Sequence, residues 1–146
     1  MHTGWLMGIL VSLTLFGRME SIANITKSLK AVLEEKRDHR RVLVLYGRDD
    51  VQHFLLEQQD ALHTEEKQLA ERDLDVIVLV ASTLPEPDRQ FLMQDPFKLM
   101  PSDGFHGWLI GKDGGVKHTF RKPVEPKELF RIIDSMPMRQ AEAKKH

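Results

Sequence analysis

Two runs of almost entirely apolar residues stand out in the pattern of the chain. Residues 42–46 read Val-Leu-Val-Leu-Tyr, and residues 74–80 read Leu-Asp-Val-Ile-Val-Leu-Val. Continuous apolar runs of this length, rich in β-branched side chains, are typical of strands buried on both faces in the centre of a mainly parallel sheet. The pattern therefore predicts two central strands.

Apolar residues recur at helical spacing before, between and after these strands. The predicted helices are residues 24–37, about 50–72, a short segment around 91–93 that ends before Pro96, and 126–136. Asn24 or Thr26 is expected to cap the first helix, and residues 63–64 to bend or split the second. Pro137 ends the last helix, and we expect the polar tail from Arg139 to fray.

A hairpin completes the predicted sheet. Residues 105–110 and 116–120 have strand character, and Asp113 and Gly114 between them form an Asp-Gly turn, which is typical of antiparallel hairpins. The order of elements after the first helix is then β-α-β-(α)-β-β-α. This order predicts an α/β domain, a three-layer sandwich with a central mixed sheet and a C-terminal hairpin and helix, and it is the order of the thioredoxin fold.

The composition limits the kinds of functional site that this chain can form. The 146 residues fit one domain, and none of them is cysteine. Disulfides, thiolate nucleophiles, cysteine-based zinc sites and iron–sulfur clusters are therefore excluded. The formal net charge is −1, so no basic excess is present to attract nucleic acid or an anionic membrane surface.

The N-terminal segment has the pattern of a secretory signal peptide. Residues 5–16 are apolar or small and uncharged, too short for a membrane span of about twenty residues but suited to the apolar core of a signal peptide. Small residues at Ser21 and Ala23 favour cleavage after Ala23 and export to the periplasm or medium. Arg18 follows the apolar run instead of preceding it, so a buried N-terminal helix and a true start at Met19 stay open. The expected division is a signal peptide at 1–23, a thioredoxin-like domain at 24–138 and a polar tail at 139–146.

Three stretches resemble a bacterial domain family of unknown function. They are residues 71–74 (Glu-Arg-Asp-Leu), 109–115 (Leu-Ile-Gly-Lys-Asp-Gly-Gly) and 133–139 (Ile-Asp-Ser-Met-Pro-Met-Arg). The chain is similar here to the prokaryotic branch of the DUDES domains, whose eukaryotic relatives lie in extracellular matrix and sushi-repeat proteins. The resemblance covers residues 28–142 and implies a thioredoxin- or peroxiredoxin-like fold, export and no established catalytic activity. Members with thiol redox chemistry would need a cysteine near the end of the first strand, where this chain has residues 47–50, Gly-Arg-Asp-Asp.

This loop is the first candidate site. Ligands of α/β sheets bind beyond the carboxyl ends of the strands, and Arg48 offers a cation that suits a carboxylate or phosphate. Asp49 or Asp50 could hold water or a metal ion, and Tyr46 ends the strand beside them. The simpler interpretation is structural: one aspartate caps the following helix, and Arg48 pairs with a neighbouring carboxylate.

His106 is the second candidate. Counted back from the hairpin turn, it falls near the place where thioredoxins put a cis-proline beside the active loop, and there it could face Arg48 and Tyr46 as a proton carrier or ligand. The alternative is a partly exposed strand histidine. The other histidines have no spacing that predicts a metal site. The turn at 111–115 lies between two strands, whereas a phosphate loop needs a helix after it.

Two functions remain. The preferred one is a non-catalytic exported domain that binds a protein partner or a small ligand, without thiol redox activity, cofactor or metal. The expected ligand-binding residues are Tyr46, Arg48, Asp50 and His106. The alternative is a non-thiol enzyme with a cleft built around Arg48, Asp49 and His106. No nucleic acid partner or integral membrane domain is expected, and hydroperoxide reduction as in peroxiredoxins is excluded because it needs a thiolate.

Overall fold

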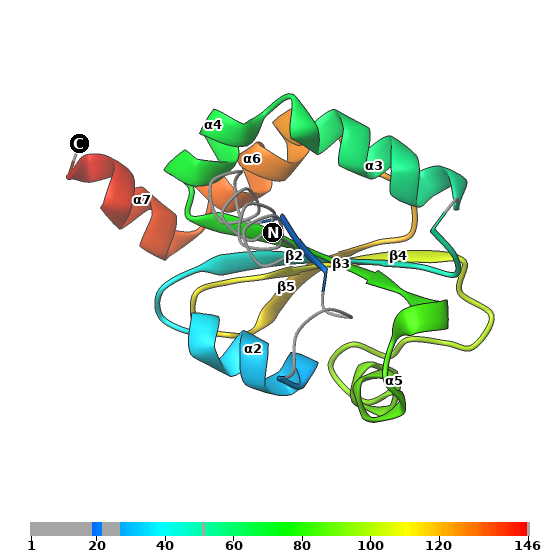
Figure 1. The fold of residues 1–146 in the computed structure, drawn as a ribbon. Helices are drawn as coiled ribbons and strands as arrows, with labels where there is room; N and C mark the ends of the chain where they lie inside the picture. Colours follow the sequence, from blue (N-terminus) through cyan, green and yellow to red (C-terminus); the bar gives the residue numbers. More distant parts are fainter. Residues whose placement is uncertain (1–18, 22–26, 51, 146) are drawn as a thin grey trace, which may run out of the picture.

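The computed structural model describes residues 19–21, 27–50 and 52–145, which form a five-stranded sheet with helices on both faces (Figure 1). The strands are β1 (Met19–Ser21), β2 (Arg41–Gly47), β3 (Leu74–Val80), β4 (Phe105–Ile110) and β5 (Val116–Phe120). The helices are α2 (Leu29–Lys36), α3 (His53–His63), α4 (Glu66–Glu71), the 3₁₀ turn η2 (Ala81–Thr83), α5 (Glu86–Met93), α6 (Pro126–Asp134) and α7 (Pro137–Lys144). Among these helices, none combines the length and apolar character that a membrane span requires.

The sheet is mixed, with a parallel half and an antiparallel half. Its strand order is β1-β3-β2-β4-β5. β3 pairs in parallel with β1 and β2, whereas β4 pairs antiparallel with β2 and β5. β2 has a neighbour on each side and is buried along its whole length, which explains its unbroken apolar run from Val42 to Tyr46. β5 lies at the edge, and its three central residues are exposed.

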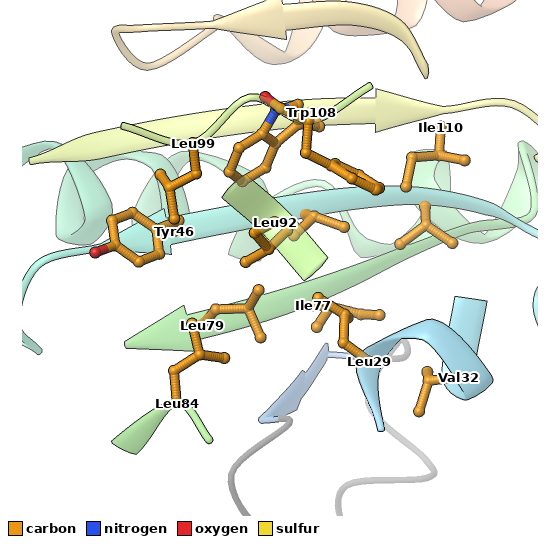
Figure 2. Packing of buried hydrophobic residues seen from close by; sticks show 13 residues of the cluster. Leu29, Val32, Tyr46, Ile77, Leu79, Leu84, Leu92, Leu99, Trp108 and Ile110 are labelled. Carbon is orange, nitrogen blue, oxygen red and sulfur yellow. The ribbon is translucent and has the colours of Figure 1, made fainter. Parts of the chain in front are cut away.

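Alternate residues of the central strands point into two separate apolar cores. Val42, Val44 and Tyr46 of β2 point into the core between the sheet and helices α2 and α5, shown in Figure 2. Leu43 and Leu45 point into the other core, which α3, α4 and α6 cover from the opposite face (Figure 1). This alternation is the period-two pattern of a strand buried on both faces. The predicted three-layer α/β sandwich is confirmed.

The predicted strands agree closely with the structure, and the predicted helices agree less well. β3, β4 and β5 have their predicted bounds, and β2 is one residue longer at each end. The helix predicted over 50–72 is divided into α3 and α4 at Thr64, whose hydroxyl donates to the carbonyl of Ala61 at 3.0 Å. The first helix begins after Ser28, whose side chain accepts a backbone N–H at 3.1 Å. The caps predicted at Asn24 and Thr26 are therefore wrong, and both residues lie outside the described part of the chain.

Most of the predicted signal peptide also lies outside the described residues. Its residues 19–21 are the exception, because they form β1 beside β3. Cleavage after Ala23 would remove this strand and leave the sheet β3-β2-β4-β5, with β3 at its edge.

The C-terminal segment is helical, contrary to the predicted fraying. Pro137 ends α6 as expected, but it also begins α7, where a proline in the first turn loses no hydrogen bond. Arg139, the first residue of the predicted tail, is buried with 7% of its surface exposed. This segment is polar because charged side chains attach it to the rest of the domain.

The end of β2 requires a glycine because α3 passes close to it. A Cβ atom at Gly47 would lie 2.5 Å from Cδ2 and 3.2 Å from Cβ of the buried Leu55. A Cβ atom at Gly104 would meet only the side-chain nitrogen of Gln52 at 3.7 Å, an ordinary contact.

We predict that Gly47→Ala lowers the free energy of unfolding by about 1–3 kcal/mol, the usual cost of overpacking. Gly104→Ala is the matched control, and we expect it to change the free energy by less than about 0.5 kcal/mol. Urea unfolding of the two variants measures both values. Equal effects would show that the contact with Leu55 does not require the glycine.

Candidate functional site

The loop after β2 is held against the loop before β4. The backbone N–H of Arg48 donates to the carbonyl of Gly104 at 2.9 Å, and its guanidinium donates through Nη2 to the carbonyl of Ser102 at 2.7 Å. Arg48 therefore pairs with a carbonyl oxygen, and the predicted pairing with a carboxylate is wrong. The two loops that flank the carboxyl end of β2 form one joined surface.

The aspartates of this loop do not cap the following helix. Helix α3 begins after Gln52, whose side-chain oxygen accepts the backbone N–H of Leu55 at 2.8 Å. The expected aspartate cap is therefore wrong. Asp49 and Asp50 are both exposed.

His106 lies opposite Tyr46 in the register of β4 and β2. Both side chains point to the face covered by α2 and α5, because paired residues of an antiparallel ladder share a face. His106 is 2% exposed, so the alternative of a partly exposed strand histidine is wrong. Its ring stacks on Trp108 with the centroids 4.1 Å apart.

A carboxylate orients the ring of His106. Nδ1 of His106 lies 3.3 Å from Oδ2 of Asp103, which also accepts the backbone N–H of Met100 at 2.9 Å. Oδ1 of Asp103 accepts from the guanidinium of Arg121 at 2.6 Å. In the neutral ring, a proton on Nδ1 makes the bond to Asp103 and leaves Nε2 as an acceptor. Nε2 is buried and has no hydrogen-bond partner among the described residues.

Burial decides the protonation state of this histidine. Loss of solvation lowers the pKa of His106 below its ordinary value and outweighs the hydrogen bond with Asp103, which acts in the opposite direction. Burial alone would raise the pKa of Asp103, but the bonds from Met100 and His106 and the charge of Arg121 lower it. Near pH 7 the cluster therefore holds a neutral imidazole, an ionised carboxylate and a guanidinium.

A hollow of about 230 Å³ opens beside this cluster, at the carboxyl end of β2. Its lining residues are Tyr46, Leu99, Met100 and Pro101 together with Glu86, Arg89, Gln90 and Met93 of α5. The four α5 residues follow the spacing i, i+3, i+4 and i+7 and so share one face of the helix. Figure 2 shows the phenol of Tyr46 at the edge of the apolar core with its oxygen pointing away from the core.

The structure brings together some of the predicted site residues. Tyr46 lines the hollow, and His106 pairs with it across the strands. Arg48 and His106 share no hydrogen bond or ion pair within the described chain, since Arg48 binds Ser102 and His106 binds Asp103. The cleft of the enzyme hypothesis needs these two side chains around one space, and neither lines the hollow.

Sequence reasoning missed the α5 face and the Asp103 cluster. The face could have been found from the helical spacing of Glu86, Arg89, Gln90 and Met93. The pair of Asp103 and His106 depends on a loop that the sequence does not specify. Over the described residues, no group of three or more histidine or carboxylate side chains could hold a metal ion.

These observations define the class of the protein. It is a thioredoxin-like α/β domain in which the loop between β2 and α3, where thioredoxins keep their reactive thiols, has no cysteine. The chain belongs to the family described as "Domain of unknown function (DUF4174)", which matches residues 32–142. Among curated proteins no match is found.

Solved structures confirm the fold. A reduced 2-Cys peroxiredoxin of Plasmodium vivax superposes with a TM-score of 0.57 and 16% identity, over 75% of this chain and 72% of that chain. The mitochondrial 2-Cys peroxiredoxin of Plasmodium falciparum superposes with a TM-score of 0.52 and 12% identity, over 78% of this chain and 84% of that chain. At these identities the likeness shows a shared fold and nothing of activity.

We predict that His106 makes stability fall as the solution becomes acidic. The folded chain holds His106 neutral with a lowered pKa, whereas the unfolded chain binds a proton near pH 6.5. The unfolded state therefore gains more protons as the pH falls below about 6.5, and stability is lost by at most about 1.4 kcal/mol per pH unit for one group. His106→Asn, which keeps a donor toward Asp103, should flatten this slope even though it lowers stability at pH 7.

Urea unfolding between about pH 7.5 and pH 5 measures the slope, above the range where an aspartate such as Asp103 titrates in the unfolded chain. His118→Asn is the matched control, because His118 is exposed on β5. An unchanged slope in His106→Asn would contradict the assignment.

Proposed function

We propose that this protein is a non-catalytic binding domain whose ligand occupies the hollow at the carboxyl end of β2. The observation that supports the proposal is the lining of the hollow, in which one face of α5 and the segment 99–101 surround the buried Tyr46. In α/β sheets the carboxyl ends of the strands are the usual place for a ligand.

The size and chemistry of the hollow indicate a small occupant. Its volume of about 230 Å³ is below the range of about 300–1,000 Å³ that holds drug-sized ligands. It suits one side chain of a partner protein or a molecule of similar size. Met93 and Met100 are 38% and 53% exposed and give adaptable apolar walls. The hydroxyl of Tyr46, whose oxygen points away from the apolar core (Figure 2), offers one polar contact.

The neighbouring loop extends this surface. Arg48 is fixed through Ser102, which adjoins Pro101 at the rim of the hollow. Its guanidinium has donors beyond the one used by Ser102, so Arg48 could bind a carboxylate or carbonyl oxygen of a bound peptide. Asp50 is exposed on the same loop. Because no cysteine is present, we assign no thiol redox activity to this surface.

We also propose that the domain is exported and that the family is a bacterial one related to the DUDES domains. The apolar run at 5–16 and the small residues before Asn24 support export. The three motif stretches at 71–74, 109–115 and 133–139 support the relationship. The partner is then a protein or small molecule of the cell envelope.

The binding prediction concerns the walls of the hollow. The probes are the N-acetyl amides of leucine, methionine and phenylalanine, followed by NMR of the labelled protein. We expect the largest shifts at the methyl groups of Met93 and Met100. Met100→Lys should weaken binding by about tenfold because it removes apolar contact worth about 1.4 kcal/mol. Tyr46→Phe should weaken only a ligand that uses the hydroxyl, by about threefold to tenfold.

The control is Met138→Lys on α7, where Met138 is 46% exposed and lies outside the hollow. It should leave binding unchanged. Shifts centred elsewhere, or equal binding by Met100→Lys and the unaltered protein, would overturn the proposed site.

The export prediction is tested by N-terminal sequencing. The full chain is produced in bacteria and the cells are fractionated. We expect periplasmic or secreted protein that begins near Asn24. A cytosolic product with Met1 intact contradicts export. A product beginning at Met19 identifies the alternative start and a domain that keeps β1.

A further inference from the structure

Helix α7 is attached to the domain by charged side chains. Arg139 is its one buried residue and Glu142 is half-buried, while the other described residues of the helix are exposed. Figure 1 shows α7 extending away from the layers that cover the sheet. Without an apolar face, the helix depends on the ion pairs of Arg139 and Glu142.

Glu142 binds two cationic side chains, Arg41 and Lys112, which together are called the cradle below. Its Oε1 accepts from Nη1 of Arg41 at 3.0 Å, and its Oε2 accepts from Nη2 of Arg41 at 3.0 Å and from Nζ of Lys112 at 2.8 Å. The side chain of Arg41 is 1% exposed and that of Lys112 is 10% exposed. A bidentate guanidinium with an added ammonium group is the donor geometry that binds carboxylate and phosphate groups most strongly.

The cradle needs an anion from outside the body of the domain. Nη1 of Arg41 also donates to the carbonyl of Arg72, but Glu142 is its one carboxylate partner among the described residues. Lys112 is shared with Asp73. Removal of Glu142 would leave a buried cation without its counter-charge, which is strongly unfavourable. Nε of Arg41 is also buried without a hydrogen-bond partner in the described chain, so Glu142 does not use every donor of the cradle.

The second attachment is also electrostatic. Arg139 donates to Oδ1 of Asp134 and to Oε1 of Glu71, both at 3.2 Å, and Arg72 donates to both oxygens of Asp134 at 2.9 Å. Hollows of about 460 Å³ and about 60 Å³ lie along the helix, the first beside Arg139 and the second beside Arg41. Surface hollows therefore flank both of the ion-paired attachments of the helix.

We propose that Arg41 and Lys112 form an oxyanion-binding site, that Glu142 fills it in the free protein, and that a carboxylate or phosphate group of a partner replaces Glu142 and releases α7. The tethered carboxylate competes at an effective concentration of the order of millimolar. A free anion therefore binds detectably only when it is concentrated or when Glu142 is removed.

The first test uses Glu142→Gln and two probes, inorganic phosphate and acetate, each at constant ionic strength. Thermal unfolding and isothermal titration measure the binding. We expect phosphate to bind Glu142→Gln at least about tenfold more tightly than it binds the unaltered protein, the effect of freeing one charged hydrogen-bonding site. A response to phosphate alone identifies a phosphate group as the ligand, and a response to both probes identifies carboxylates as well.

Two controls separate site binding from general stabilisation of proteins by phosphate. Glu128→Gln removes an exposed carboxylate that pairs with Arg131 and should show no gain. The double variant Lys112→Gln with Glu142→Gln should lose most of the gain. Equal responses in Glu142→Gln and Glu128→Gln, or an undiminished response in the double variant, would overturn the proposal.

A second test uses the unaltered full chain. Trypsin cleaves after Arg139 only when α7 leaves the domain, because Arg139 is buried and paired. The peptide 140–144, which remains because trypsin also cleaves after the exposed Lys144, is measured by mass spectrometry. We expect tens of millimolar phosphate to speed this cleavage severalfold at constant ionic strength, since that concentration exceeds the effective concentration of Glu142. A rate that does not depend on phosphate would show that the anion does not displace the helix.

Discussion

Two charged side chains of the central strands are buried in the interior, and each must be paired with an opposite charge. This need determines how the elements at the amino-terminal ends of β2 and β3 are arranged. Asp75 on β3 is fully buried, and Arg41 on β2 is 1% exposed. Asp75 accepts from Lys36 at 2.7 Å and from Arg40 at 2.8 Å, so the end of α2 is fixed to the sheet. Arg41 forms an ion pair with Glu142 of α7. A buried ion that loses its partner typically costs about 3–5 kcal/mol, so the pairs of Asp75 add to the apolar packing of α2, whereas α7 is held by ion pairs with little apolar contact.

The two ends of the sheet therefore differ in the contacts that they make. The residues of the three motif stretches meet at the amino-terminal edge, where Lys112 contacts Asp73 and Arg72 contacts Asp134. The carboxyl end has the hollow and the loop that lacks a cysteine. Sites separated in this way and without shared partners contribute almost independently to stability. The proposed ligand surface can thus vary without weakening the contacts that hold α2 and α7.

The pattern of apolar residues predicted the sheet well because buried strands are specified locally. The run at 42–46 and the strand character of 105–110 follow from burial against the two cores, and both can be recognised from the residue types of the chain alone. The helix ends and the site depended on contacts between distant segments. Arg48 bonds to Ser102, 54 residues away, and Arg41 bonds to Glu142, 101 residues away. One local signal was present: Asp75 inside an otherwise apolar strand indicates a buried carboxylate and hence nearby cations.

The absence of cysteine changes what the carboxyl end of the sheet must provide. A thiol site needs groups that lower the pKa of a thiolate and leave it open to solvent. Here the ring of His106 is buried against Trp108 and held neutral, with its free nitrogen enclosed. Such a group stiffens the wall of a site and exchanges protons poorly with a ligand. Next to it, Met93 and Met100 are exposed at the wall of the hollow and give it an adaptable apolar surface. Rigid polar support behind an adaptable apolar wall is the combination on which the proposed binding function rests.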